Sequence, residues 1–109
     1  MSLRTLDKKT LLSSATTGAG AGSAFSVERS KGWTFVIVSS SVTSGATVDI
    51  EAYFSDSSAW HVVHSQSVTG DGSVMIRDDM GHYEKIRAKV SSRVDGTYSV
   101  YATGTVDSL

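Results

Sequence analysis

Apolar and polar residues alternate strictly from Thr47 to Phe54, and this alternation predicts a β-strand with one buried face. The apolar set of alternate positions is Val48, Ile50, Ala52 and Phe54. The polar set is Thr47, Asp49, Glu51 and Tyr53. Successive side chains of a strand point to opposite faces of its sheet, so one set should be buried and the other exposed. Ser55–Ser58 predicts a tight turn, after which Trp60 begins a second strand.

The same rhythm returns along most of the chain, and it predicts an all-β protein. Gly-containing turns at Thr69–Gly72 and Asp95–Gly96 separate short apolar stretches, and Asp-Gly is typical of hairpin turns. Asp78–Gly81 reads as a loop. The predicted strands are 23–29, 33–38, 47–54, 60–66, 74–77, 83–91 and 97–105. Short strands at this spacing predict an antiparallel β-sandwich, either jelly-roll-like or immunoglobulin-like.

Trp33–Val38 is the most apolar stretch, and it is apolar on both faces. Trp33, Phe35 and Ile37 share one face, and Val36 and Val38 share the other. A strand in a two-layer sandwich normally has one face in water. We therefore expect the second face to be covered, either by the N-terminal segment or by another subunit.

Residues 1–22 differ in pattern from the predicted sandwich domain, residues 23–109. Four leucines precede a Gly-Ala connector, and such a composition is typical of a flexible or extended linker. We predict an extended N-terminal arm that docks its leucines on a neighbour; a disordered tail and a first β-strand are the alternatives. The four leucines are Leu3, Leu6, Leu11 and Leu12.

Composition and charge narrow the class of protein further. The 109 residues suffice for one domain, the formal net charge is −1, and there is no cysteine. Disulfides and thiolate chemistry are therefore excluded, and folding in a reducing cytoplasm is expected. Neither a signal peptide nor a stretch long enough to span a membrane is recognisable, and the charge favours neither nucleic acid nor membrane as a partner.

No group of residues forms a recognisable catalytic or metal-binding pattern. His61 and His64 are three positions apart, which on a regular strand would point them to opposite faces. No Gly-x-Ser-x-Gly motif is present, and Asp49 and Glu51 lie on a flat strand surface. We predict that the protein is not an enzyme and needs neither metal nor cofactor.

Two sets of surface side chains invite a binding function, and each also has a structural explanation. Lys85, Arg87 and Lys89 could contact an acidic partner, but we expect them to pair across strands with acids such as Asp49 and Glu51. Aromatic residues could stack on sugar rings or pack at a subunit interface, and we favour the interface. These aromatic residues are Trp33, Tyr53 and Tyr101.

Three segments of the chain together resemble small β-sandwich structural proteins of bacteriophage virions. The segments are Tyr53–Trp60, Tyr83–Val90 and Asp95–Val100, within a resemblance that covers roughly residues 24–105. In that pattern an Asp caps the turn and a Trp fills the core, which here implies Asp56 and Trp60. Ser57 departs from it, because glycine is common there.

The resemblance implies a virion protein that acts by binding. We expect a capsid decoration or cement protein, with a tail or head–tail connector subunit, or a carbohydrate-binding module on a tail or fibre, as alternatives. The implied partners are the major capsid protein or other virion subunits and further copies of the chain, and the implied location is the virion. The expected interaction residues are Leu3, Leu6, Leu11, Leu12, Trp33, Phe35, Ile37, Tyr53 and Tyr101.

Overall fold

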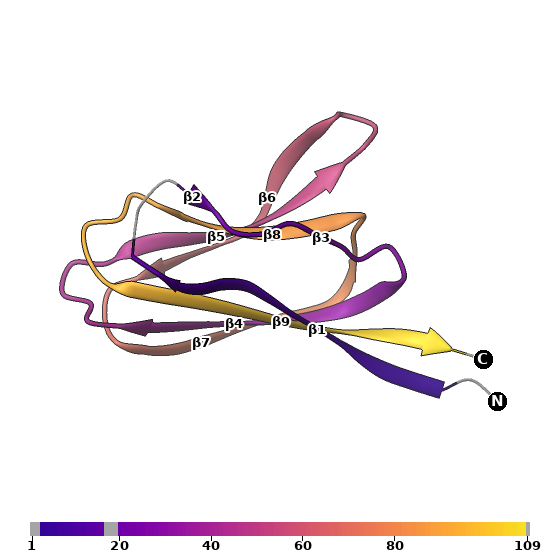
Figure 1. Ribbon diagram of the computed structural model, residues 1–109, viewed down its shortest axis with the longest axis horizontal. Coiled ribbons are helices and arrows are strands. Elements are labelled where there is room, and N and C mark those ends of the chain that lie inside the picture. Colours follow the sequence, from indigo (N-terminus) through magenta and orange to yellow (C-terminus); the bar gives the residue numbers. More distant parts are fainter. Residues whose placement is uncertain (1–2, 17–19, 109) are drawn as a thin grey trace.

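Strands account for every regular element of the part of the chain that the structure describes. The computed structural model describes residues 3–16 and 20–108 (Figure 1). No helix in these ranges has the length and apolar character of a membrane span. The strands are β1 (Leu3–Ala15), β2 (Gly20–Ala21), β3 (Phe25–Ser26), β4 (Ser30–Ser40), β5 (Ala46–Phe54), β6 (Ala59–Val68), β7 (Gly72–His82), β8 (Lys85–Ser91) and β9 (Thr97–Ser108).

The strands form two antiparallel sheets that pack face to face. The first sheet has the order β1-β9-β4-β7, and the second has the order β2-β8-β5-β6, with β3 also paired to β8. β2 and β3 lie along the same edge of β8, where Gly20 pairs with Val90 and Phe25 with Ile86. Counted as one interrupted strand, they complete the strand order of a jelly roll. The predicted all-β antiparallel sandwich is therefore confirmed.

The core lies between the sheets and follows the alternation read from the sequence. Val48, Ile50 and Ala52 of β5 are fully buried, as predicted, whereas Phe54 is 37% exposed because β5 runs past the edge of the sandwich there. Burying one large apolar side chain contributes about 1.5–3 kcal/mol. The other buried apolar side chains include Trp33, Phe35, Ile37, Ile86, Ala88, Val90, Tyr98, Val100 and Ala102.

The N-terminal segment is not a separate arm in its described part, which corrects the predicted boundary between residues 1–22 and 23–109. β1 pairs with β9 from Leu3 to Ala15, so this segment is an edge strand of the sandwich. Register shifts on both sides of Leu12 let the neighbouring residues Leu11 and Leu12 both point into the core. A Cβ at Gly22 would lie 2.0 Å from the Leu11 carbonyl oxygen, so the connector must be glycine at this close approach.

β7 and β3 are among the strands whose bounds differ from the predicted extents. The segment Asp78–Gly81, predicted as a loop, continues β7 to His82. The predicted strand 23–29 is reduced to β3, because the amide of Ser30 bonds the carbonyl of Val27 and turns the chain. Carboxylates and small residues normally break strands, and here the pairing of β7 with β4 overrides that preference.

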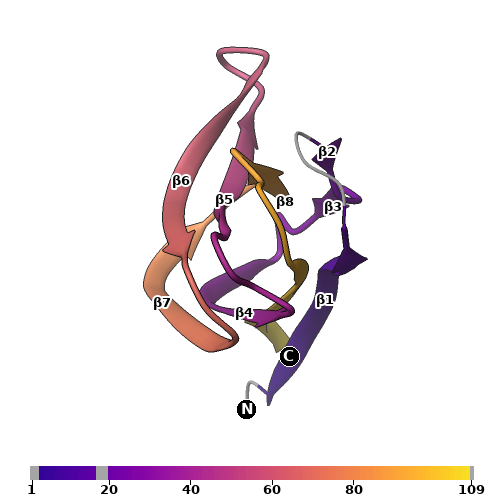
Figure 2. The ribbon, with the colours of Figure 1, turned by 90° about the vertical axis from the view of Figure 1, so that its left-hand side faces the viewer.

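The β5–β6 hairpin projects beyond the sandwich on the side of the second sheet (Figures 1 and 2). Its turn contains Ser58 with φ of 52°, in the left-handed region. The sequence pattern places the expected glycine at Ser57, whereas the strained backbone falls one residue later.

Candidate interaction surface

The outer face of the first sheet carries an unusually apolar row of side chains. Val36 of β4 lies between Tyr101 of β9 and Met75 of β7, its partners on the two neighbouring strands. Met75 is 64% exposed and Tyr101 is 45% exposed. Cross-strand neighbours on one face lie about 4.5–5.5 Å apart, so the three side chains form a continuous row.

Two further exposed apolar side chains lie on the same outward face. Val38, two residues after Val36 on β4, is 40% exposed. Leu6 of β1 is 63% exposed, but it pairs with Thr105 and is separated from Tyr101 along the ladder by Lys8 and Thr103. We call this surface the apolar face; it consists of Leu6, Val36, Val38, Met75 and Tyr101.

Two cations flank the apolar face. Lys8 pairs with Thr103 on the β1 side, and Arg77 pairs with Thr34 on the β7 side. Among the described residues, neither cation has a carboxylate within ion-pair distance. Asp79, exposed two residues beyond Arg77, is a described acid on the same outward side of β7. The apolar face is therefore apolar at its centre, with the cation Lys8 on the β1 side and the opposite charges of Arg77 and Asp79 on the β7 side.

The outer face of the second sheet pairs part of its charge internally, although Lys89, opposite Asp49, has no described ion pair. Arg87 Nε donates to Glu51 Oε1 at 2.7 Å, and the guanidinium lies 4.1 Å from the ring centroid of Trp60. Asp49 accepts hydrogen bonds from the hydroxyls of Ser65 and Ser91. The expected pairing of the basic stripe with the acidic stripe is confirmed for Arg87 and Glu51. We call this surface the paired face.

The aromatic residues of the paired face are covered by cations. Lys85 Nζ lies 5.2 Å from the ring centroid of Tyr53, and Tyr53 packs edge-on against Trp60 at 5.6 Å. Trp60 is the cross-strand partner of Tyr53 on the outward side, so the expectation that it fills the core is wrong. The outward position follows from register, because partners across a ladder share a face.

The structure places most of the predicted interaction residues in the core. Trp33, Phe35 and Ile37 are buried between the sheets, and Leu11 and Leu12 join them. The prediction that these five residues contact a partner is therefore wrong, because they are buried inside their own sandwich. Tyr53 is half-buried in the paired face, and the side chain of Leu3 lies outside the described residues.

Leu6 and Tyr101 are the predicted residues that the structure leaves on the surface. Val36 and Val38 were recognisable from the two-sided apolar pattern of their strand, whose second face the N-terminal segment does not cover. Met75 was missed. Its outward position follows once β7 is known to be a long strand, since Val74 and Ile76 on either side point inward.

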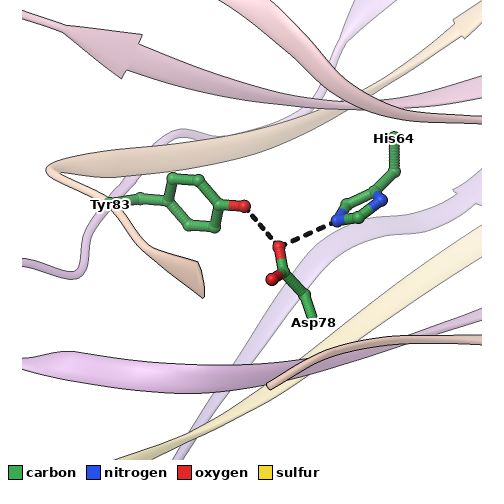
Figure 3. A network of polar contacts seen from close by, with 3 residues as sticks. All are labelled: His64, Asp78 and Tyr83. Atoms are coloured by element: carbon green, nitrogen blue, oxygen red, sulfur yellow. Dashed lines mark hydrogen bonds and ion pairs between the residues drawn. The ribbon is translucent and has the colours of Figure 1, made fainter. Parts of the chain in front are cut away.

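A polar network links the two sheets from inside (Figure 3). Asp78 of β7 faces inward beside Trp33, its cross-strand partner. Its Oδ2 atom bonds His64 Nε2 of β6 at 2.9 Å and accepts a hydrogen bond from the Tyr83 hydroxyl. One carboxylate oxygen thus joins a strand of the second sheet and the β7–β8 connection to the first sheet.

The network fixes the ionisation of Asp78 and Tyr83. Burial by itself raises the pKa of Asp78, but the hydrogen bonds from Tyr83 and His64 outweigh burial and place the pKa below its usual value. Burial raises the pKa of Tyr83, and the adjacent Asp78 raises it further. At neutral pH Asp78 is therefore an anion that accepts, and Tyr83 a neutral phenol that donates.

The two histidines of β6 do not point to opposite faces as predicted. The register shift between Ile50 and Glu51 makes Val63 an extra residue, so His61 and His64 pair with Ala52 and Ile50 on the same side. They nevertheless have different hydrogen-bond partners. His61 Nε2 lies 2.7 Å from Ser57 Oγ at the hairpin tip, whereas His64 bonds Asp78. Among the described residues no group of three or more potential ligands could hold a metal ion.

Comparison with known proteins identifies the fold but no family. No protein-family model matches the chain, and no curated protein matches it in sequence. Among solved structures, it is similar to the SPBc2 prophage-derived protein YomS, with a TM-score of 0.67 and 15% identity over 94% of this chain and 95% of that one.

Two further structures share the fold at lower similarity. A chain from the disulfide-linked pili of Bacillus endospore appendages has a TM-score of 0.59 and 11% identity, covering 97% of this chain and 89% of that one. The family 29 carbohydrate-binding module CBM29-2 has a TM-score of 0.50 and 11% identity, covering 94% and 86%. At these identities the likeness shows a shared β-sandwich fold.

Proposed function

We propose that this protein is a structural component of a bacteriophage virion, and more specifically a capsid decoration or cement protein. The observation that carries the proposal is the apolar face, an exposed row of apolar side chains on a rigid sheet. Its partners would be the major capsid protein or other virion subunits, together with further copies of the chain. The protein would act by binding and would catalyse no reaction.

The contrast between the two outer faces supports a binding role for one of them. On the paired face Arg87 is bonded to Glu51, and the rings of Tyr53 and Trp60 are covered by Lys85 and Arg87. The apolar face leaves Met75, Tyr101 and Val38 exposed, although a continuous exposed apolar patch favours aggregation unless a partner covers it. A protein that functions inside an assembly would have such a partner.

The fold comparisons are consistent with this proposal. YomS is described as a prophage-derived protein, and the pili of endospore appendages are assemblies of subunits. Both share a sandwich with this chain, and neither is similar enough in sequence to transfer a role. They make a structural role in an assembly a natural use of this fold.

A carbohydrate-binding role is the second candidate, favoured by the fold of CBM29-2 and by exposed Tyr101. Sugar rings stack on open aromatic faces, and the rings of Tyr53 and Trp60 already contact cations. Tyr101 therefore remains the described candidate for stacking. A glycan-array screen with the Tyr101→Ala variant as control would support this role if it found specific binding that the variant lost.

The test of the proposed function is to locate the protein. Particles would be purified from a host culture that carries the gene, and their proteins identified by mass spectrometry and immunogold electron microscopy. We expect a fixed number of copies per particle, with label on the shell. Label on the tail would favour the tail or connector alternative, and recovery only in the free protein fraction would contradict a virion role.

A further inference from the structure

A groove lies between the projecting hairpin and the end of the sandwich. Its volume is about 360 Å³, and its lining combines aromatic and acidic side chains. Phe54, on the hairpin, is 37% exposed there. We call this surface the hairpin groove; it is lined by Glu28, Phe54, His82, Tyr83 and Glu84.

The charge of the hairpin groove is negative. Glu84 Oε2 accepts a hydrogen bond from the backbone amide of Ser55 at 2.8 Å, and bonds from Ser55 lower the pKa of Glu84. Glu28 is exposed, and Asp56 is exposed at the adjoining turn. His82 Nε2–H donates to the carbonyl of Glu28 at 2.7 Å. Of the nearby cations, Lys85 and Arg87 contact Tyr53 and Trp60 on the paired face, and Arg29, the residue after Glu28, is exposed.

The apolar face has the complementary character. Its centre is apolar, and Lys8 and Arg77 flank it without described carboxylate partners. The apolar face is the outer side of the first sheet, whereas the hairpin groove lies at the end of the sandwich, between Phe54 of β5 and the β7–β8 connection. They cannot meet within one copy, but they can meet between copies.

We propose that copies of this protein bind head to tail, with the hairpin groove and turn of one copy seated on the apolar face of the next. Phe54 would pack on the row formed by Val36, Met75 and Tyr101. The carboxylates of Glu28 and Asp56 would approach Lys8 and Arg77. This contact rests on the proposed function, which makes the apolar face a surface for subunit contacts.

The charges favour this arrangement over a symmetric face-to-face dimer. Such a dimer would bring the face that carries Lys8 and Arg77 against the same face of its partner, and like charges across an interface disfavour association. A head-to-tail contact joins two different surfaces, so it builds a closed ring or an open filament rather than a dimer.

Charge reversal on each surface separates the two arrangements. The face variant combines Lys8→Glu and Arg77→Glu, and the groove variant combines Glu28→Lys and Asp56→Lys. Glu84 is left unchanged because it holds the hairpin backbone at Ser55. The mass of each full-length protein would be followed with concentration by light scattering and mass photometry at low ionic strength.

We expect the wild type to form assemblies larger than a dimer, and each variant alone to weaken the contact by at least about tenfold. Mixed in equal amounts, the two variants should reassemble, because each reversed surface again meets an opposite charge. Added salt should weaken all of these contacts. If either reversed pair fails to fold, Lys8→Gln with Arg77→Gln and Glu28→Gln with Asp56→Asn give the same comparison without rescue.

Three results would overturn the contact. A wild type that stays monomeric, a groove variant that assembles like the wild type, or a mixture that stops at dimers would each rule it out. Failure here is distinguishable from failure of the proposed function. A face variant that is lost from particles while the wild type stays monomeric would remove the self-contact and leave the virion role standing.

Discussion

The two outer faces of this sandwich are built from the same kind of strand, but they differ in whether their central side chains have partners within the molecule. On the paired face, Arg87 is bonded to Glu51 and stacked on Trp60. On the apolar face, Arg77 stands beside Thr34 and near exposed Met75 without a described ion-pair partner. On the paired face the central charges and aromatic rings are partnered within one molecule. The apolar face has the composition of a surface that is completed by another molecule.

The largest effect is expected when the central side chains of the apolar face are removed. Two central contacts at an interface together contribute about 2–3 kcal/mol, so Tyr101→Ser combined with Met75→Ser should weaken binding to particles on the order of 100-fold. Both side chains are exposed, so the free energy of unfolding should change by less than about 0.5 kcal/mol. Copies per particle would be counted by quantitative mass spectrometry, and unfolding followed in urea.

Val62→Ser is the matched control for that variant. Val62 is 53% exposed on the paired face, so its loss removes apolar surface of similar exposure from the other side of the molecule. Incorporation should be unchanged. An equal loss would mean that the two faces do not differ in function.

The next prediction compares two arginines. Arg87→Ala leaves Glu51 buried without its partner and removes the contact with Trp60, so it should destabilise the fold by about 2 kcal/mol. Arg77→Ala removes no described ion pair and should cost less than about 0.5 kcal/mol. Urea unfolding of both variants measures the difference, and similar costs would refute the contrast between the faces.

A smaller effect is expected from the network that joins the sheets internally. Asp78→Asn weakens the bonds to His64 and Tyr83 and should cost about 1–2 kcal/mol at neutral pH. The folded pKa of Asp78 lies below the unfolded value, so its contribution is complete above the unfolded pKa and is lost as pH falls through the folded pKa.

Below about pH 4 the free energy of unfolding of the variant should therefore fall less steeply with decreasing pH than that of the wild type. The decline that remains would come from Glu84 and Asp95, whose pKa values are also lowered, by hydrogen bonds from backbone amides among others. Urea unfolding at a series of pH values measures this slope. An unchanged slope in the variant would show that Asp78 is not one of the groups that set it.

The smallest predicted effect concerns the turn of the projecting hairpin. Ser58 has a positive φ, a backbone conformation that is energetically unfavourable for any residue with a Cβ atom. Ser58→Gly should therefore stabilise the protein by about 0.5 kcal/mol. Ser57→Gly should not stabilise it, because its φ is not in the left-handed region. Thermal unfolding of the two variants, side by side, tests whether the strain lies where the backbone places it.

The fold was predictable from the sequence where the strands are regular. The alternation from Val48 to Ala52 and from Ile86 to Val90 places each apolar residue inward, because one face of a paired strand must be buried. The two-sided apolar pattern around Val36 also indicated a surface in need of cover. Local pattern is sufficient in these cases because the register is undisturbed.

The sequence-based predictions are wrong in two situations. In one, an extra residue in a strand changes which sheet face the following side chains occupy; in the other, a partner distant in the chain overrides the local preference for secondary structure. Val63 shifts the register and brings His61 and His64 to one side, and the shifts around Leu12 bury two consecutive leucines. Asp78 lies within a strand because His64 and Tyr83 bond its carboxylate. A register shift or a long-range polar bond leaves little local signal in composition, so these features required the three-dimensional structure.

The central place of β9 has a consequence for how the molecule is made. β9 lies between β1 and β4 and supplies buried Tyr98, Val100 and Ala102, yet it is synthesised after every other strand of the sandwich. While it is still in the ribosome, β1 has no neighbour in its sheet and the apolar face lacks Tyr101. The surface that would contact other subunits therefore comes into existence last, which delays association until each copy has folded.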